Sequence, residues 1–364
     1  MHPNDPALQR LIDRVMSAQA AGAALCIRGG GTKDFYGETP SGTLLDTTTL
    51  VGSADHEPTE LVVTAPAGMK LVELEAQLAD HDQCLAFEPP RFGPGSTVGG
   101  MVAAGLSGPS RAAVGSVRDY VLGATMLNGR AEVMSFGGQV MKSVAGYDVP
   151  RLLVGSLGTL GLILEVSLKV LPEAPASATL RFDMDHAGAL QALNELAGQP
   201  LPVHASAWWD GTLLLRLRGA LAAVNSAIVK LGGELIEPEF GSRFWQGLRD
   251  HGDEYFVKAG QAVAHGAALW RLSLPPTTPP LELHGETLIE WGGAQRWLVT
   301  ALPAAQVRDA ATRAGGHATL FRATNKSAGV FAPLQAPLDR IHRELKKAFD
   351  PAGLFNPGRL YPGL

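Results

Sequence analysis

Three glycine-rich runs in the first half of the chain have the residue types of a phosphate-binding cradle. They are Arg28-Gly29-Gly30-Gly31-Thr32-Lys33, Pro94-Gly95-Ser96-Thr97-Val98-Gly99-Gly100 and Gly155-Ser156-Leu157-Gly158-Thr159-Leu160-Gly161. A pyrophosphate is best held by main-chain N–H groups that point into a concavity, and a Cβ atom would obstruct that approach. A single run of this kind is usually a tight turn. Three runs within one half of the chain favour a site for a dinucleotide.

The composition is that of a globular protein large enough for two domains. Of the 364 residues 46% are hydrophobic and 18% are charged, which allows a large buried core. The 43 glycines follow no Gly-X-Y period, so they mark turns and close backbone contacts. The net charge is −5 and the Lys and Arg residues are scattered, so we expect neither a nucleic acid nor a lipid surface as partner.

The sequence predicts a cytoplasmic protein. The N-terminus has no basic and apolar segments of the secretory type, and no stretch reaches the roughly eighteen apolar residues that a membrane span needs. Cys26 and Cys84 are the only cysteines. They are too few for the four thiolates of an iron–sulfur cluster or for a disulfide framework.

Local patterns predict a mixed α+β domain over residues 1–172. Apolar residues recur at helical spacing at 8–16 and 71–78, and the first glycine run follows an apolar strand. Asn128-Gly129-Arg130, between two apolar runs, is a strong hairpin signal. The predicted strands cover residues 23–27, 61–65, 121–127, 131–136 and 160–171.

Residues 173–330, after the boundary Pro172-Glu173-Ala174-Pro175-Ala176, contain a weak internal repeat. Each copy has a Trp-containing turn, an apolar strand, a helix and a Gly-Gly pair. The copies run from Trp209-Asp210-Gly211 to Gly232-Gly233 and from Trp291-Gly292-Gly293 to Gly315-Gly316. We predict two strand–helix units that pair into one ferredoxin-like sheet; chance recurrence is the alternative.

Residues 331–364 are predicted to return to the first domain. This segment begins with a helix and ends in Phe355-Asn356-Pro357-Gly358-Arg359. A terminus so rich in Pro and Gly is rarely a frayed tail. The first domain, with its ligand, is the expected docking surface.

The ligand that fits these motifs is FAD. A nicotinamide-binding Rossmann domain has Gly-x-Gly-x-x-Gly in its first strand-to-helix turn and an acidic residue about twenty positions later. Here the first run is Gly29-Gly30-Gly31-Thr32, followed by Asp34-Phe35-Tyr36-Gly37. Glycine runs from distant parts of one domain indicate an elongated ligand, and FAD has that shape.

Taken in order, the motifs resemble those of vanillyl-alcohol-oxidase-type (PCMH) flavoproteins. Two more runs contribute to the likeness, Gly115-Ser116-Val117-Arg118-Asp119-Tyr120-Val121-Leu122-Gly123 and Lys142-Ser143-Val144-Ala145-Gly146-Tyr147-Asp148. Within that family the chain looks like the FAD-binding subunits of bacterial glycolate oxidases, the smaller of two flavin subunits. Ser143 stands where asparagine is common and Leu157 where glutamate is common.

The resemblance implies a two-subdomain FAD-binding domain, a ferredoxin-like second domain and a set of cofactor contacts. Pyrophosphate and ribityl contacts fall on the first two runs, the adenosine on 158–163, and the flavin ring beside Asn356 and Arg359. The implied residues are Arg28, Gly29, Gly30, Gly31, Thr32, Lys33, Pro94, Gly95, Ser96, Thr97, Gly99, Gly100, Gly115, Ser116, Arg118, Asp119, Gly158, Thr159, Gly161, Ile163, Asn356 and Arg359.

We expect the FAD to be bound non-covalently. Some members of the family attach FAD through a His or Cys near these loops, but Thr32 follows the triple glycine here and there is no His between His2 and His56. Cys26 lies in a predicted strand, and Cys84 is the one alternative tether. Arg118 and Asp119 have the alternative of a surface ion pair.

Catalytic residues for a 2-hydroxy acid are harder to assign. Such an oxidation needs a cation for the carboxylate and a base or metal for the hydroxyl proton. The His-x-Gly-Asp-Gly-Asn-x-His metal motif of related dehydrogenases is absent, and His251-Gly252-Asp253-Glu254 is interpreted as a solvated turn, so no metal site is expected. His317, Arg322 and Lys326 remain as weak candidates.

Three functions stay open on this basis. The first is an FAD-binding subunit of a glycolate oxidase complex, with a larger flavin subunit and an iron–sulfur subunit as partners, delivering electrons toward quinone and reaching the inner membrane only through those partners. The second is a self-sufficient, metal-independent FAD oxidoreductase of a small hydroxy acid or alcohol. The third is a degenerate scaffold without cofactor.

Overall fold

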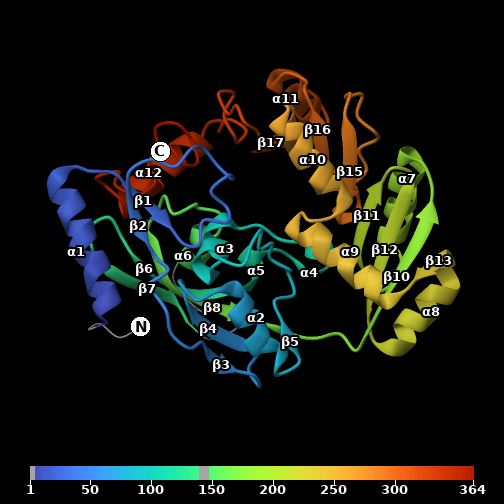
Figure 1. Cartoon of the computed structure of the whole chain (residues 1–364), viewed down its shortest axis with the longest axis horizontal. Helices are drawn as coiled ribbons and strands as arrows, with labels where there is room; N and C mark the ends of the chain where they lie inside the picture. Colours follow the sequence, from blue (N-terminus) through green and yellow to red (C-terminus); the bar gives the residue numbers. More distant parts are fainter. Residues whose placement is uncertain (1–4, 139–146) are drawn as a thin grey trace. The chain divides into compact units, whose positions relative to one another are not determined.

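The computed structural model describes residues 5–138 and 147–364, and these form two compact units (Figure 1). The first unit comprises the described residues of Met1–Leu106, Ser116–Pro172 and Pro333–Leu364; the second comprises Ser107–Gly115 and Glu173–Ala332. Both units combine helices with sheet, so the predicted α+β class is confirmed. Among the described residues no helix has the length and apolar composition that crossing a bilayer requires.

The main sheet of the first unit has five antiparallel strands among the described residues, in the order β3-β4-β8-β6-β7. Two smaller sheets accompany it, a parallel pair β1-β2 and an antiparallel pair β5-β9. The strands are β1 (Leu25–Arg28), β2 (Thr43–Asp46), β3 (Asp55–Glu57), β4 (Val62–Pro66), β5 (Gln83–Cys84), β6 (Val121–Leu127), β7 (Val133–Gly137), β8 (Leu162–Lys169) and β9 (Leu171–Pro172).

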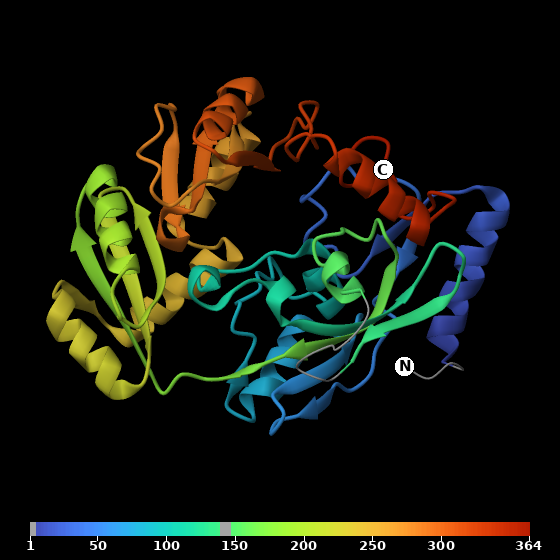
Figure 2. The same cartoon turned by 180° about the vertical axis from the view of Figure 1, so that it is seen from behind.

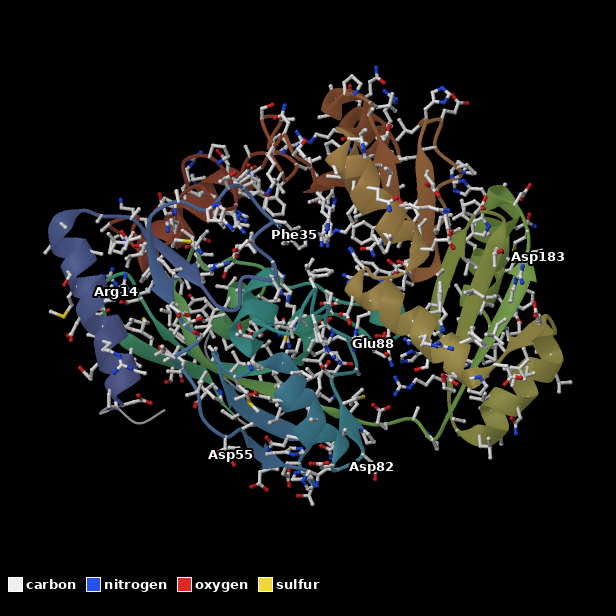
Figure 3. All side chains as sticks on the ribbon, in the orientation of Figure 1. Arg14, Phe35, Asp55, Asp82, Glu88 and Asp183 are labelled. Atoms are coloured by element: carbon white, nitrogen blue, oxygen red, sulfur yellow. The ribbon has the colours of Figure 1, made fainter. Side chains whose placement is uncertain are left out.

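The apolar periodicities predicted at 8–16 and 71–78 fall on two helices of the first unit, α1 (Pro6–Ala21) and α2 (Leu71–Ala79). The unit also contains α3 (Val98–Ala104), α5 (Val117–Tyr120), α6 (Val149–Leu153) and α12 (Leu338–Phe349). Asp5 caps α1, and the helix buries Leu8, Leu11 and Val15 on one face. Arg14, labelled in Figure 3, lies on this helix. Its guanidinium donates to the carbonyl of Leu44 at 2.6 Å.

The predicted hairpin is confirmed as β6 and β7, whereas the predicted strand over 160–171 is divided in two. Val62 pairs with Lys169, and the amide of Val170 still donates to the carbonyl of Leu61 at 2.9 Å. Leu61 has φ 56°, a left-handed conformation, so the pairing of β8 with β4 ends there. Leu171 and Pro172 then pair with β5 in a separate sheet. The extent of the neighbouring strand β4 decides where β8 ends, so this division cannot be predicted from the sequence of β8 alone.

The second unit is built on an eight-stranded sheet, in the order β13-β10-β12-β11-β15-β16-β14-β17, among the described residues. Its elements are α4 (Arg111–Val114), β10 (Ala176–Asp183), α7 (His186–Ala197), β11 (Val203–Trp209), β12 (Thr212–Gly219), α8 (Leu221–Leu231), β13 (Glu234–Ile236), α9 (Pro238–Asp250), α10 (Glu254–Ala264), β14 (Ala268–Ser273), β15 (Glu286–Glu290), the 3₁₀ helix η1 (Trp291–Gly293), β16 (Gln295–Thr300), α11 (Ala304–Arg313) and β17 (His317–Arg322).

The sheet is a double ferredoxin-like arrangement, and the repeat is larger than predicted. Each half contributes four strands in equivalent spatial order, with β12–α8 matching β16–α11. The halves meet at β11 and β15, which precede the repeated Trp-containing turns, so the predicted strand–helix units share one sheet without pairing directly. In the second half, residues 274–285 replace the first helix of the motif.

Helices cover both faces of this sheet. Leu190 on α7 and Val224 on α8 pack on the face that carries Leu215 and Leu217 of β12, and α11 packs on the equivalent face of the second half. Helices α9 and α10 cover the opposite face. Figure 2, in which the molecule is seen from behind, shows α7 and α8 against the green strands.

One short segment departs from the predicted domain division. Residues Ser107–Gly115, which the sequence assigns to the first domain, belong to the second unit because α4 packs against β11 and η1. The indole N–H of Trp291 donates to the carbonyl of Gly108 at 3.0 Å, and the guanidinium of Arg111 lies 4.6 Å from the centre of the Trp291 ring. These contacts join residues far apart in sequence.

The run His251-Gly252-Asp253-Glu254 forms the corner between α9 and α10. His251 ends α9 in the left-handed conformation, and its ring stacks on Phe256 with centroids 3.5 Å apart, so it is a packed side chain and the predicted solvated turn is wrong. Asp253 caps α10 by accepting from the amide of Phe256 at 3.4 Å. Burial raises the pKa of Asp253 to about 6.

We expect Asp253→Asn to increase the stability of the second unit at pH 7, because Asn caps as well as Asp and carries no charge to bury. The pKa of Asp253 in the folded state, about 6, lies above the ordinary value of 3.8 for an aspartate. Wild-type stability therefore falls as pH rises from 3.8 through 6, and the advantage of the variant grows over the same interval. Urea unfolding between pH 4 and 7 measures it.

Asp185→Asn, at the exposed cap of α7, is the matched control, for which we expect a much smaller change over this interval. A pH-independent difference between Asp253→Asn and wild type would contradict the assignment.

Candidate FAD site

The first glycine run forms an anion-binding turn at the end of β1. Gly31 has φ 72°, a left-handed conformation that glycine adopts without strain. In the described part of the chain, the main-chain amides of Gly30, Gly31 and Thr32 donate no hydrogen bond within the protein. Consecutive free amides around a left-handed residue make a concavity that attracts phosphate oxygens.

Close contact with the second glycine run excludes side chains at Gly29 and Gly30, whether or not a ligand is bound. A Cβ on Gly30 would lie 1.5 Å from the carbonyl oxygen of Gly95, and a Cβ on Gly29 would lie 2.4 Å from Oγ1 of Thr97. The two loops therefore touch through their main chains. Side chains at Gly29 or Gly30 would force them apart and would open the cleft between them.

The second run contributes side chains, because its amides are largely used. The amides of Ser96, Val98 and Gly99 donate to main-chain carbonyls, and the amide of Gly100 donates to Thr97 Oγ1 at 3.2 Å. The hydroxyl of Ser96 accepts from Lys33 Nζ at 2.8 Å. This contact places the ammonium of Lys33 between the two loops.

The C-terminal segment completes the cleft. Asn356 accepts from the amide of Ile27 at 2.6 Å and donates to the carbonyl of Leu157 at 2.6 Å, so it joins β1 to the third glycine run. A Cβ on Gly158 would lie 2.7 Å from Asn356 Nδ2. The sequence assigns Gly158 to the adenosine and Asn356 to the flavin ring, and the structure places these two residues in contact.

Arg359 brings a buried positive charge to the cleft. Its guanidinium donates to the carbonyls of Glu38 and Asp34, and among the described residues it makes no ion pair. Burial lowers the pKa of Arg359, because the charged form loses hydration that carbonyls only partly replace. An anionic ligand in the cleft would compensate this charge.

The cleft encloses about 730 Å³ of space, open solvent included. Fifteen of the residues implied by sequence line it, namely Arg28, Gly29, Gly30, Gly31, Thr32, Lys33, Ser96, Thr97, Gly99, Gly100, Gly158, Gly161, Ile163, Asn356 and Arg359. Seven further lining residues were missed: Ile27, Asp34, Thr47, Ala67, Ala103, Ala104 and Leu157.

Seven implied residues do not line the cleft. Pro94, Gly95 and Thr159 belong to its loops, and Gly115 belongs to the second unit. The carboxylate of Asp119 accepts from the amide and the hydroxyl of Ser116, at 2.8 and 3.0 Å, and Arg118 beside it is exposed. Ser116 and Asp119 therefore form a capping box at the start of α5, which is a local structural role for these two residues. Residues 142–146 of the Lys142–Asp148 motif lie outside the described residues.

The weak catalytic candidates lie in the second unit, on β17 and the loop after it. His317 and Arg322 are the first and last residues of β17, and Lys326 follows in the loop. Burial lowers the pKa of Arg322 to about 10. Among residues 5–138 and 147–364, no group of three or more His, Cys, Asp or Glu side chains is placed to hold a metal ion.

The donors of the cleft suit FAD. Free amides and the cations of Lys33 and Arg359 match a pyrophosphate, while Ile27, Ala103 and Ile163 offer apolar walls to a ring or a ribityl chain. Residues 8–137 match the FAD binding domain family. The fold and the cleft thus define a flavoprotein with an FAD binding domain, and the predicted cofactor is confirmed as FAD.

Over nearly its whole length the chain is similar to one curated oxidoreductase subunit. It is 44% identical over 98% of both chains to glycolate oxidase subunit GlcE of Escherichia coli (strain K12). It is also 31% identical to D-lactate dehydrogenase of Archaeoglobus fulgidus, over 49% of this chain and 40% of the relative. The chain belongs to the family of glycolate oxidase subunit GlcE, within the FAD-dependent oxidoreductases.

A solved structure shares the fold. Alkyldihydroxyacetonephosphate synthase superposes with a TM-score of 0.65 over 96% of this chain and 74% of that chain, at 15% sequence identity. The likeness extends through both units, so the predicted flavoprotein fold is confirmed.

We expect Gly30→Ala to weaken FAD binding, because the new Cβ must displace the carbonyl of Gly95. Overpacking of this kind costs about 1–3 kcal/mol, which corresponds to roughly 5–150-fold in affinity if it falls on the bound state. Quenching of FAD fluorescence on titration into the apoprotein measures the Kd. Gly52→Ala is the matched control, since its Cβ would lie 3.7 Å from Pro66; equal Kd values for both variants would contradict the loop contact.

We expect Lys33→Met to weaken FAD about tenfold and to leave riboflavin, which has no phosphate, unchanged. The reason is that the ammonium of Lys33 lies between the two loops that are predicted to bind the pyrophosphate. Calorimetric titration with both ligands measures the difference. Arg130→Met removes an exposed positive charge of the same unit and serves as control; an equal loss for FAD and riboflavin would sink the pyrophosphate assignment.

Proposed function

We propose that this chain is the FAD-binding subunit of a glycolate or related 2-hydroxy acid oxidase complex, and that it passes electrons toward an iron–sulfur subunit and quinone. The observation that carries the proposal is the 44% identity, over 98% of both chains, to a glycolate oxidase subunit. The cleft supports it independently, because its free amides and cations suit a dinucleotide.

In this proposal the first unit is the FAD-binding domain. FAD, when bound, supplies two-electron redox chemistry. The amides of Gly30, Gly31 and Thr32 bind the pyrophosphate, and Lys33 neutralises part of its charge. Asn356 and Arg359, held by main-chain contacts to Ile27 and Glu38, close one end of the cleft. These residues bind and orient the cofactor and move no proton.

The second unit corresponds in this proposal to a substrate-type or cap domain, without the main substrate site. The sequence contains no His-x-Gly-Asp-Gly-Asn-x-His motif to activate a hydroxy acid. Arg322 is a candidate for carboxylate binding, since a guanidinium matches a carboxylate in shape and charge. We therefore assign the hydroxyl oxidation to a larger flavin subunit.

Electron delivery in this proposal needs a partner protein. The two cysteines of this chain, Cys26 and Cys84, form no disulfide, and two thiols cannot supply the four ligands of a cluster. An iron–sulfur subunit would accept the electrons, and it would bring the complex to the cytoplasmic side of the inner membrane.

The test is anaerobic reduction by glycolate. The purified chain, loaded with FAD, should keep its flavin absorbance on mixing with glycolate or D-lactate and should bleach only after the larger flavin subunit is added. Rapid bleaching of the chain alone would overturn the partner role in favour of a self-sufficient oxidoreductase. A chain that takes up no FAD would indicate a scaffold.

A further inference from the structure

A buried lysine lies outside the cleft, on α12. Lys346 is 8% exposed, and its Nζ donates three hydrogen bonds of 2.7 Å, to the carbonyls of Thr159 and Phe355 and to Oδ2 of Asp350. One ammonium group therefore links three segments of the first unit: the C-terminal helix, the third glycine run and the chain that follows the helix.

Its partner Asp350 fixes the next turn of the chain. Asp350 is 1% exposed and accepts from the amides of Leu354 and Phe355, at 3.0 and 2.8 Å. A Cβ on Gly129 would lie 2.4 Å from Oδ1 of Asp350, so the hairpin between β6 and β7 packs directly against this carboxylate. A movement of the Lys346–Asp350 pair would therefore displace both the hairpin and residues 354–355.

The segment fixed in this way is the one that reaches the cleft. Phe355 pairs with Leu25 of β1 in parallel, with hydrogen bonds from Leu25 N to Leu354 O at 2.7 Å and from Asn356 N to Leu25 O at 2.9 Å. The side chains of Asn356 and Arg359 then line the cleft. Both views place α12 beside β1 and β2 (Figures 1 and 2).

A buried ion pair is a weak source of stability, because desolvation offsets the Coulomb attraction, and its best-attested use is to fix one arrangement among several. Here the arrangement fixed is the register of residues 354–359 on β1. A shift by one residue would exchange Asn356 for a proline or a phenylalanine at the position that bonds Ile27 and Leu157.

We propose that Lys346 and Asp350 are positioning residues for FAD, which hold residues 354–359 on β1 so that Asn356 and Arg359 line the cleft, and that FAD binding is coupled to this docking. The inference rests on the FAD site proposed above. Coupling is reciprocal: if a docked segment strengthens FAD binding, FAD must strengthen docking by the same factor.

Hydrogen exchange on the wild-type chain tests the coupling without any substitution. With saturating FAD, the amides of Leu354, Phe355 and Asn356 should exchange at least about fivefold more slowly than in the apoprotein, while those of α1 should not change. Protection of Gly30–Thr32 without protection of 354–356 would overturn the coupling and leave the FAD site intact. Protection of neither would overturn the site itself.

Variants test the positioning role. Lys346→Met combined with Asp350→Asn leaves no unpaired buried charge, and we expect its Kd for FAD to rise about tenfold, at a temperature where circular dichroism shows the apoprotein folded. Lys347→Met, an exposed neighbour on α12, is the control and should bind FAD as wild type does. A folded double variant with wild-type Kd would overturn the proposal; if it does not fold, the exchange experiment decides.

Discussion

The cofactor cleft depends on one steric constraint, the contact of two main chains at Gly30 and Gly95. No side chain fits between the carbonyl of Gly95 and the α-carbon of Gly30. The contact sets the width of the cleft and brings Ser96 within reach of Lys33. It also leaves three consecutive amides without a partner among residues 5–138 and 147–364. Glycine here serves loop-to-loop packing first, and the exposed amides are its consequence.

Charge in the cleft is arranged to suit an anion. Carbonyl oxygens orient the guanidinium of Arg359, and the nearby Asp34 and Glu38 carboxylates compensate only part of the effect of burial, which lowers its pKa. Arg28, in contrast, pairs with Asp34 at 2.7 Å at the rim, where solvent screens both groups. The buried cation is thus the one left to a ligand, while the exposed cation is already paired.

The sequence predicts the local features of this fold well because each of them is determined by a few neighbouring residues. Helix α1, the β6–β7 hairpin and the first glycine run have their own periodicity or turn residues. Ala103 and Ala104 were missed although they lie on α3 one turn beyond Gly100, a spacing that marks one helix face. Thr47 was missed because its place depends on the parallel pairing of β2 with β1.

Long-range features were predicted only in outline. Residues Ser107–Gly115 belong to the second unit because they contact Trp291. Trp291 lies much later in the sequence, so no local pattern predicts this assignment. The same holds for the end of β8, whose length is set by β4. The two halves of the large sheet were detected because their Trp and Gly residues repeat. The pairing of β11 with β15, which joins the halves, is a contact between distant segments that the repeat does not predict.

The bond between Asn356 and Ile27 spans 329 positions, and it has a consequence for biosynthesis. The polypeptide emerges from the ribosome with β1 first, and the residues that seal the cleft arrive only after the entire second unit has been translated. A nascent chain carries the glycine loops without their C-terminal neighbours throughout that interval. The complete cleft therefore exists only after both units have been synthesised.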